Sequence, residues 1–134
     1  MPETIRVSTF LPGVPPERVY RAWLDPAEHG AFSGGRAEIE AFAGGRFTAW
    51  DGYIQGTTLE MEPPGRILQA WRTTEFPEGS PDSSLEILFE GTEGGTQVTL
   101  NHSQIPDGQG EDYRQGWEDY YFAPMQEYFS AGQE

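Results

Sequence analysis

The 134-residue sequence predicts one α+β domain, residues 1–134, in which an antiparallel sheet is covered by a long C-terminal helix. Three observations lead to this fold class. Apolar and polar residues alternate through successive short segments, which is typical of strands with one wet face. Turns rich in glycine and proline separate these segments. The last segment, residues 111–130, has apolar residues at helical spacing instead, so the strands come first and a helix closes the sheet.

The N-terminal part of the sequence predicts a strand followed by two short helices. Residues 5–10 alternate apolar and polar side chains and end at a proline–glycine turn. A helix is expected to begin at Pro16, because proline is tolerated in a first helical turn, and to end after Leu24 at Asp25-Pro26. A second short helix is expected over residues 27–32.

The middle of the sequence predicts a series of strands connected by tight turns. They are expected at residues 36–42, 46–51, 57–62, 66–74, 85–90 and 98–102. The last two form the clearest hairpin, because Gly94 and Gly95 supply the positive φ that tight turns require. Trp50 alternates with Phe47 and Ala49, so one of these sets faces outward or occupies a bulge, and both arrangements stay open.

The C-terminal segment carries a broad apolar stripe that is expected to face the sheet. Its members are Tyr113, Trp117, Tyr120, Tyr121, Pro124, Met125, Tyr128 and Phe129. A proline within the helix removes the hydrogen bond to the carbonyl of residue 120 and kinks the axis. Two consequences are open: the kink leaves a gap against the sheet, or it bends the helix around a curved sheet.

Composition excludes several classes of function. The formal net charge is −14, from 22 acidic residues against 8 arginines and no lysine. Such a surface repels phosphate backbones and anionic headgroups, so neither nucleic acid nor a membrane is an expected partner. The absence of cysteine excludes disulfides, thiolate metal sites and thiol catalysis. A cytoplasmic location is expected, since no signal-peptide pattern and no membrane-length apolar run is present.

No catalytic or metal-binding constellation is recognisable, and no cofactor is expected. His29 and His102 are the two histidines, and neither has a second histidine three or four residues away. His29 is expected to be solvated near a helix end. His102 lies on the same side of a strand as Leu100 and is expected to be a hydrogen-bonded structural residue, with a general base as the alternative. A surface pair of Arg72 with Glu86 is expected on neighbouring strands.

Two motifs near the C-terminus point to a known family. Gln-Gly-Trp-Glu-Asp-Tyr-Tyr-Phe at residues 115–122 and Pro-Met-Gln-Glu-Tyr-Phe at residues 124–129 closely resemble the homologues of the activator of heat shock protein 90 ATPase. The opening helix at residues 15–23, Gly-Gly-Arg-Phe at 44–47 and the last strand at 95–100 agree with this resemblance. It covers nearly the whole chain and corresponds to the C-terminal domain of the eukaryotic activators, whose additional N-terminal domain makes the principal chaperone contact.

The resemblance implies the helix-grip fold of the START-like, Bet v 1-like superfamily (SRPBCC). There a curved antiparallel sheet of six or seven strands wraps around a long C-terminal helix, and two short helices follow the first strand. The superfamily implies a cavity between helix and sheet for lipids, polyketides or other apolar molecules, with plain packed core as the alternative. The residues expected to line it are Trp23, Phe32, Leu59, Met61, Trp71, Ile87, Phe89, Leu100, His102, Trp117 and Tyr121.

Three functions follow as hypotheses. The first is a binding domain that holds an apolar or amphipathic small molecule between the sheet and the C-terminal helix. The second is a co-chaperone-like interaction domain, active in stress response, whose partner is a chaperone or another protein. The third is an enzyme of the cyclase or hydrolase kind found in the same superfamily, which would need a polar group such as His102 inside an accessible cavity.

Overall fold

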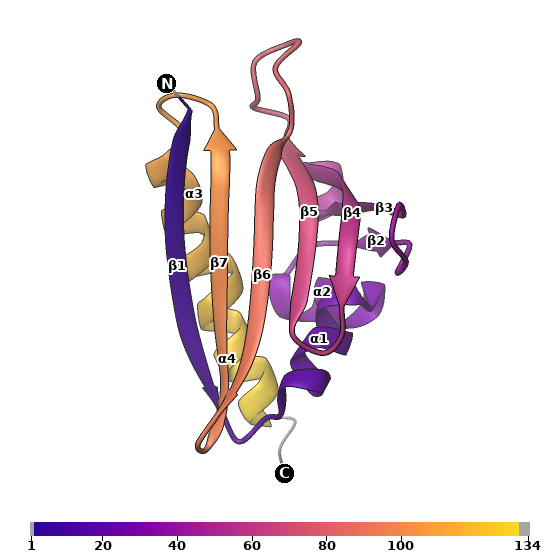
Figure 1. Cartoon of the computed structure of the whole chain (residues 1–134), viewed down its shortest axis with the longest axis vertical. Helices are drawn as coiled ribbons and strands as arrows, with labels where there is room; N and C mark the ends of the chain where they lie inside the picture. Colours follow the sequence, from indigo (N-terminus) through magenta and orange to yellow (C-terminus); the bar gives the residue numbers. More distant parts are fainter. Residues whose placement is uncertain (1, 132–134) are drawn as a thin grey trace.

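The computed structural model describes residues 2–131 and is built on a seven-stranded antiparallel sheet. The strands are β1 (Glu3–Pro12), β2 (Glu38–Ile39), β3 (Arg46–Ala49), β4 (Ile54–Glu62), β5 (Arg66–Thr73), β6 (Ser83–Thr92) and β7 (Gly95–Ile105). Their order across the sheet is β1-β7-β6-β5-β4-β3-β2. The sheet curves around the C-terminal helix, as Figure 1 shows, so the predicted helix-grip fold is confirmed.

Two short helices connect β1 to β2, where the sequence predicts them. They are α1 (Pro16–Leu24) and α2 (Pro26–Ser33). Asp25 separates them, and its carboxylate accepts hydrogen bonds from the backbone N–H groups of Ala27 and Glu28 at the start of α2. Gly34 ends α2 in the left-handed conformation that favours glycine. Within residues 2–131, no helix combines the length and the apolar character needed to cross a membrane.

The C-terminal helix is continuous but changes its winding along its length. It consists of α3 (Gly110–Gly116), the π-helical segment η2 (Trp117–Phe122) and α4 (Ala123–Ala131). The N–H of Ala123 bonds to the carbonyl of Glu118, five residues back. Pro124 follows directly and has no N–H to offer. The irregularity predicted at this proline therefore takes the form of a widened turn just before it.

One face of the sheet is buried beneath this helix. Ile67 of β5 pairs with Ile87 of β6, which in turn pairs with Leu100 of β7, so the three side chains share one face. All three are fully buried. The helix lies across this face (Figure 1). Its Trp117 and Tyr121 side chains are buried, and the Trp117 ring contacts Trp71 of β5. The prediction that the helix covers the sheet with its aromatic side is confirmed for Trp117 and Tyr121, whereas Tyr120, expected on the same stripe, is exposed.

The predicted strands at residues 36–42 and 46–51 are too long. Only Glu38–Ile39 of the first pairs with β3, and β3 ends at Ala49. The chain then makes the short helical turn η1 (Trp50–Gly52), in which Trp50 and Asp51 have φ of 53° and 57°. Phe47 and Ala49 face the core, and Trp50 leaves the strand altogether. A local hydrophobic pattern does not reveal such a left-handed turn.

Leu59 does not lie on the concave face, contrary to expectation. The pairing of β4 with β5 shifts register between Thr58 and Glu60, which makes Leu59 the extra residue of a β-bulge. Thr58 is fully buried in its place, and the Leu59 side chain is 49% exposed. Because side chains alternate with a period of two, a single extra residue exchanges the two faces of a strand.

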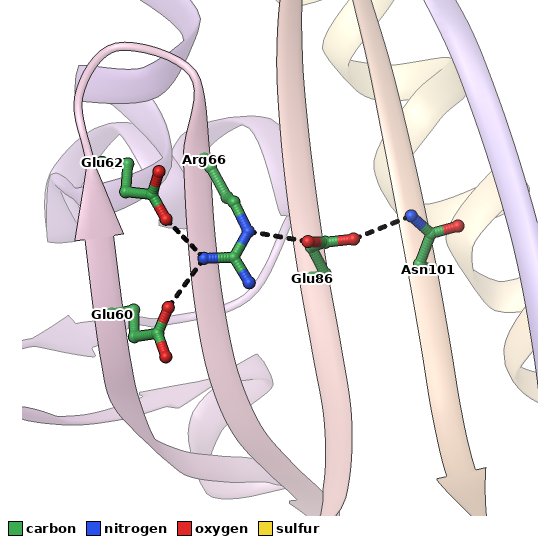
Figure 2. Close-up of polar contacts among 5 residues, drawn as sticks. All are labelled: Glu60, Glu62, Arg66, Glu86 and Asn101. Atoms are coloured by element: carbon green, nitrogen blue, oxygen red, sulfur yellow. Dashed lines mark hydrogen bonds and ion pairs between the residues drawn. The ribbon is translucent and has the colours of Figure 1, made fainter.

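The outer face of the sheet carries an ion cluster that the sequence did not predict. The Arg66 guanidinium contacts the carboxylates of Glu60, Glu62 and Glu86 at 2.8, 2.6 and 2.7 Å (Figure 2). Asn101 donates to the other oxygen of Glu86. The Arg66 and Asn101 hydrogen bonds hold the pKa of Glu86 below its usual range. The expected Arg72–Glu86 pair is therefore wrong.

Arg72 finds its partners in the loop that follows β5 instead. Its guanidinium donates to the carboxylate of Asp82 at 2.9 Å and to the carbonyl of Ser80 at 3.0 Å. In the sheet register, Leu68 and not Arg72 lies opposite Glu86. Arg66 is closer to Leu68 along β5 than Arg72 is, so Arg66 is the arginine that reaches this glutamate.

Candidate functional site

A cavity of about 390 Å³ lies between the C-terminal helix and the β4–β5 side of the sheet. Seven of its nine lining residues are aromatic, so its walls are mainly ring faces and ring edges. The lining residues are Trp50, Tyr53, Ile54, Trp71, Tyr113, Gly116, Trp117, Tyr120 and Tyr121. The Tyr120 side chain is 56% exposed, which shows that the cavity reaches the surface.

The helix contributes one wall through residues three and four positions apart. Tyr113, Gly116, Trp117 and Tyr120 follow this spacing, which places them on one face. Tyr121 joins them where the winding widens into the π-helical segment. Gly116 leaves an opening in this wall, because a Cβ atom there would meet nothing nearer than the Tyr120 ring at 4.0 Å.

The opposite lip of the cavity is formed by Trp50 in the left-handed turn η1. Its ring meets the Tyr120 ring edge-on, with 5.2 Å between centroids and 72° between planes. This contact joins the β3–β4 connection to the helix beside the mouth of the cavity. Non-glycine residues at positive φ carry backbone strain and are concentrated at functional sites.

The floor of the cavity is a set of interlocked rings. The Trp71 ring from β5 lies 5.5 Å from Trp117 and 5.1 Å from Tyr113, measured between centroids. Trp117 and Tyr121 are 4.8 Å apart at 63°. The Trp71–Tyr113 and Trp117–Tyr121 pairs are edge-to-face, and such pairs each contribute about 0.5–1.5 kcal/mol beyond burial. The rings of the floor therefore stabilise one another by direct contact.

His102 holds Trp117 in place from beneath the floor. The indole N–H of Trp117 donates to Nδ1 of His102 at 3.2 Å. Nε2 of His102 lies 2.8 Å from the Ser83 hydroxyl, which itself donates to the Trp71 carbonyl, so Nε2 carries the proton. Burial lowers the pKa of His102 to about 3. Both nitrogens are engaged, as expected for a structural histidine, and His102 does not line the cavity.

His29 is buried and not solvated, which corrects the expectation from its place near a helix end. Its side chain is fully enclosed, and its Nδ1 donates to the Trp23 carbonyl at 2.8 Å. Its Nε2 accepts from the Tyr121 hydroxyl at 2.7 Å. Burial lowers the pKa of His29 to about 4 and raises the pKa of Tyr121. The helix packs over α2, and this contact removes His29 from water.

One edge of the cavity is polar. The Tyr53 hydroxyl donates to the carboxylate of Glu75, in the loop after β5. The Tyr113 hydroxyl donates to Oε1 of Gln109 at 2.6 Å and lies 2.7 Å from the Thr73 hydroxyl. Burial raises the pKa of Tyr53 and of Tyr113, and the Glu75 charge adds to both shifts. Both phenols are therefore neutral at physiological pH.

Three of the residues predicted to line the pocket do so: Trp71, Trp117 and Tyr121. Trp23 touches only a deeper void of about 10 Å³, which is room for about one water molecule. The others lie elsewhere, either in the packed core or, for Leu59, on the outside. The core residues are Phe32, Ile87, Phe89, Leu100 and His102, with Met61 partly buried beside them.

Six lining residues were missed by sequence reasoning: Trp50, Tyr53, Ile54, Tyr113, Gly116 and Tyr120. The three that belong to the helix, Tyr113, Gly116 and Tyr120, follow one another at helical spacing alongside Trp117, and this spacing is a signal that predicts them. No comparable signal exists for Trp50 and Tyr53, because they approach the helix through an irregular turn. In the described part of the chain, no cluster of three or more potential metal ligands occurs.

Comparison with known proteins gives the family. The family model for Activator of Hsp90 ATPase homolog 1-like protein matches residues 13–130. The human activator of 90 kDa heat shock protein ATPase homolog 1 is 32% identical over 124 residues, which are 92% of this chain and 36% of the human protein. A Dictyostelium discoideum homologue is 28% identical over 76% of this chain and 27% of its own length. The chain thus spans about a third of these curated relatives.

Solved structures show the same fold. An HSP90 activator from Plasmodium falciparum superposes with a TM-score of 0.86 at 24% identity, covering 95% of this chain and 96% of that one. CalU16 from Micromonospora echinospora superposes with a TM-score of 0.77, also at 24% identity, covering 92% and 74%. Together with the match over residues 13–130, these findings establish that the chain belongs to the Activator of Hsp90 ATPase homolog 1-like family.

Proposed function

We propose that the chain binds a small apolar or amphipathic molecule in the cavity between the sheet and the C-terminal helix. The observation that carries this proposal is an open cavity of about 390 Å³ with seven aromatic rings in its walls. Protein interiors are close-packed and rarely leave space larger than a water molecule. Ligand pockets, in contrast, have volumes of about 300–1,000 Å³ with mainly apolar walls and a few polar groups.

The affinity would come mainly from removing ligand carbon from water. At about 25 cal/mol per Å², burying about 300 Å² of apolar ligand surface gives about 7.5 kcal/mol before the costs of association are subtracted. The hydroxyls of Tyr53 and Tyr113 at one edge would orient the polar end of an amphipathic molecule.

Gly116 offers a way to fill the cavity without disturbing the fold. It has helical φ and ψ of −62° and −42° and opens onto the cavity. A leucine side chain placed there would occupy the ligand space, and replacing a helical glycine stabilises a helix by up to about 1 kcal/mol. We expect G116L to melt at or above the temperature of the parent chain and to lose uptake of Nile red, measured by fluorescence.

The matched control is A123L, which adds leucine on the same helix at an exposed position outside the lining. It should take up Nile red as the parent chain does. Native mass spectrometry of gently purified protein completes the test by weighing any molecule carried along. The proposal is wrong if the parent chain takes up no probe, or if G116L binds it as well as A123L.

A second candidate function is a contact with a chaperone, favoured by the match to proteins named as activators of the 90 kDa heat shock protein ATPase. Calorimetric titration of the purified chain with purified 90 kDa heat shock protein tests it. A contact through the surface would be unchanged in G116L, whereas one that depends on an occupied cavity would weaken. No heat of binding would exclude this candidate at the concentrations used.

A further inference from the structure

We infer that the molecule held in this cavity is a planar aromatic cation. The inference rests on the proposed function and adds the chemical class of the ligand. It is carried by two independent features of the cavity, namely the shape and chemistry of its walls and the sign of the charges around it.

The walls select for flat rings. Trp71, Trp117 and Tyr121 form a floor of ring faces and edges, and Trp50 and Tyr120 form the lips. A flat aromatic molecule gains stacking and edge-to-face contacts with such walls in addition to burial. A flexible acyl chain gains burial alone and loses rotamer freedom on binding. When the two molecules bury the same area, the flat aromatic molecule is therefore expected to bind more tightly.

Four hydrogen-bond donors of the lining residues are engaged within the protein. The Trp117 N–H donates a hydrogen bond to His102, and the Tyr121 hydroxyl donates one to His29. At the polar edge, the Tyr53 hydroxyl donates to Glu75, and the Tyr113 hydroxyl donates to Gln109. With these four donors engaged, the three tyrosine oxygens keep lone pairs, and the ring faces present their negative quadrupole to the ligand. Ring faces attract a cation and repel an anion.

The charged groups around the cavity are mainly negative, like the ring faces of its walls. None of the nine lining residues is basic, and the carboxylate of Glu75 stands at the polar edge. The nearby arginines Arg36 and Arg114 are each held by a glutamate, at 3.1 and 3.6 Å. With a net charge of −14, the chain attracts cations toward the mouth, and a fatty-acid carboxylate would enter without a counter-ion.

The test compares four probes of known chemistry on the full chain at pH 7.5. Proflavine is a planar aromatic cation, acridone a neutral analogue of similar shape, and 1-anilinonaphthalene-8-sulfonate an aromatic anion. Dodecyltrimethylammonium, used below its micelle concentration, is a cation with an acyl chain. We expect proflavine to bind at least about tenfold more tightly than the other three, and to lose its binding in G116L.

The outcomes separate this inference from the proposed function. If acridone, the sulfonate or the alkylammonium binds in the cavity as tightly as proflavine, the ligand class is wrong and the pocket stands. If no probe binds, the pocket fails as well. If proflavine binds equally to the parent chain and to G116L, it binds elsewhere and the inference is overturned.

Substitution of Glu75 tests the charge directly. E75Q keeps an acceptor for the Tyr53 hydroxyl and removes one negative charge at the edge of the cavity. We expect its affinity for proflavine to fall about threefold and its affinity for acridone to stay unchanged. The control is E93Q in the β6–β7 turn, which removes the same charge at the opposite end of the sheet (Figure 1). Equal losses in both variants would refute the role of Glu75.

Discussion

The two ends of the C-terminal helix meet the sheet in different ways. Toward the C-terminus, Met125 and Phe129 are fully buried, and the Phe129 ring packs against Phe32 of α2 and under the Arg18 guanidinium. Toward the N-terminus, Trp117 and Tyr121 are as deeply buried, yet a cavity of about 390 Å³ lies beside them. The same helix therefore closes one half of the core and leaves the other half hollow.

The difference lies in how the side chains are held. At the packed end, apolar side chains adopt the rotamers that pack closely and leave no void. At the hollow end, the rings of Trp117 and Tyr121 are fixed by hydrogen bonds to His102 and His29. Such rings cannot rotate into the gap without leaving a buried polar group unpaired. We therefore expect the hydrogen bonds to the two buried histidines to help keep the cavity open.

The largest expected effect is at the packed end. F129A removes a buried ring and leaves a void, so we expect the free energy of unfolding to fall by about 3–5 kcal/mol. Y120A, at the exposed lip of the hollow end, should cost less than about 1 kcal/mol. Urea denaturation of both variants measures the difference. Similar losses would show that the two ends do not differ as described.

The next effect is the pH dependence that the two histidines confer. Burial lowers the pKa of His29 to about 4 and that of His102 to about 3. In the unfolded chain both titrate near 6.5, so between these values the unfolded state binds more protons. Stability is then complete above about pH 6.5 and falls on acidification, by about 1.4 kcal/mol per pH unit for each histidine.

Urea denaturation at pH 7, 6 and 5 measures this slope. The pKa values of Glu28 and Glu86 are lowered in the folded chain, so the stability that these two groups contribute is lost only as the pH falls below the unfolded value of about 4.5. A free energy of unfolding that stays constant from pH 7 to pH 5 would contradict neutral, buried histidines. It would also mean that hydrogen bonds to neutral histidines are not what keeps the cavity open.

Sequence reasoning reached the fold and only part of the site, for a physical reason. Alternation in β5 to β7 and the helical stripe ending at Phe129 are periodic signals, and each was read correctly. Two errors fall where the backbone departs from a period, at the bulge of Leu59 and at the left-handed turn of Trp50. The wrong partner for Arg72 and the core positions of Ile87, Phe89 and Leu100 lie in regular strands, where alternation gives the face of a residue but not its neighbours. The sequence does not predict the burial of His29, because that burial depends on Tyr121, 92 positions away.

A smaller effect tests whether hydrogen bonds hold the hollow end open. Y121F keeps the ring and removes the hydroxyl that His29 accepts from. We expect a loss of about 1–3 kcal/mol, because a buried acceptor is left unpaired. Nile red affinity should fall as well, because the freed ring is able to tilt into the cavity. A variant with lowered stability and unchanged probe affinity would show that the ring position does not depend on this bond.

The smallest effect is expected on the outer face of the sheet, where Arg66 lies between three carboxylates (Figure 2). R66Q removes the cation and leaves Glu60, Glu62 and Glu86 to repel one another, at positions where water screens much of the interaction. We expect a decrease in melting temperature smaller than that of Y121F, part of which added sodium chloride restores by screening the repulsion. The matched control is R36Q, which breaks the exposed single pair with Glu38 and should leave the melting temperature unchanged. A loss in R66Q as large as in F129A would mean that charges on the outer face stabilise the fold as strongly as the apolar contacts beneath the helix.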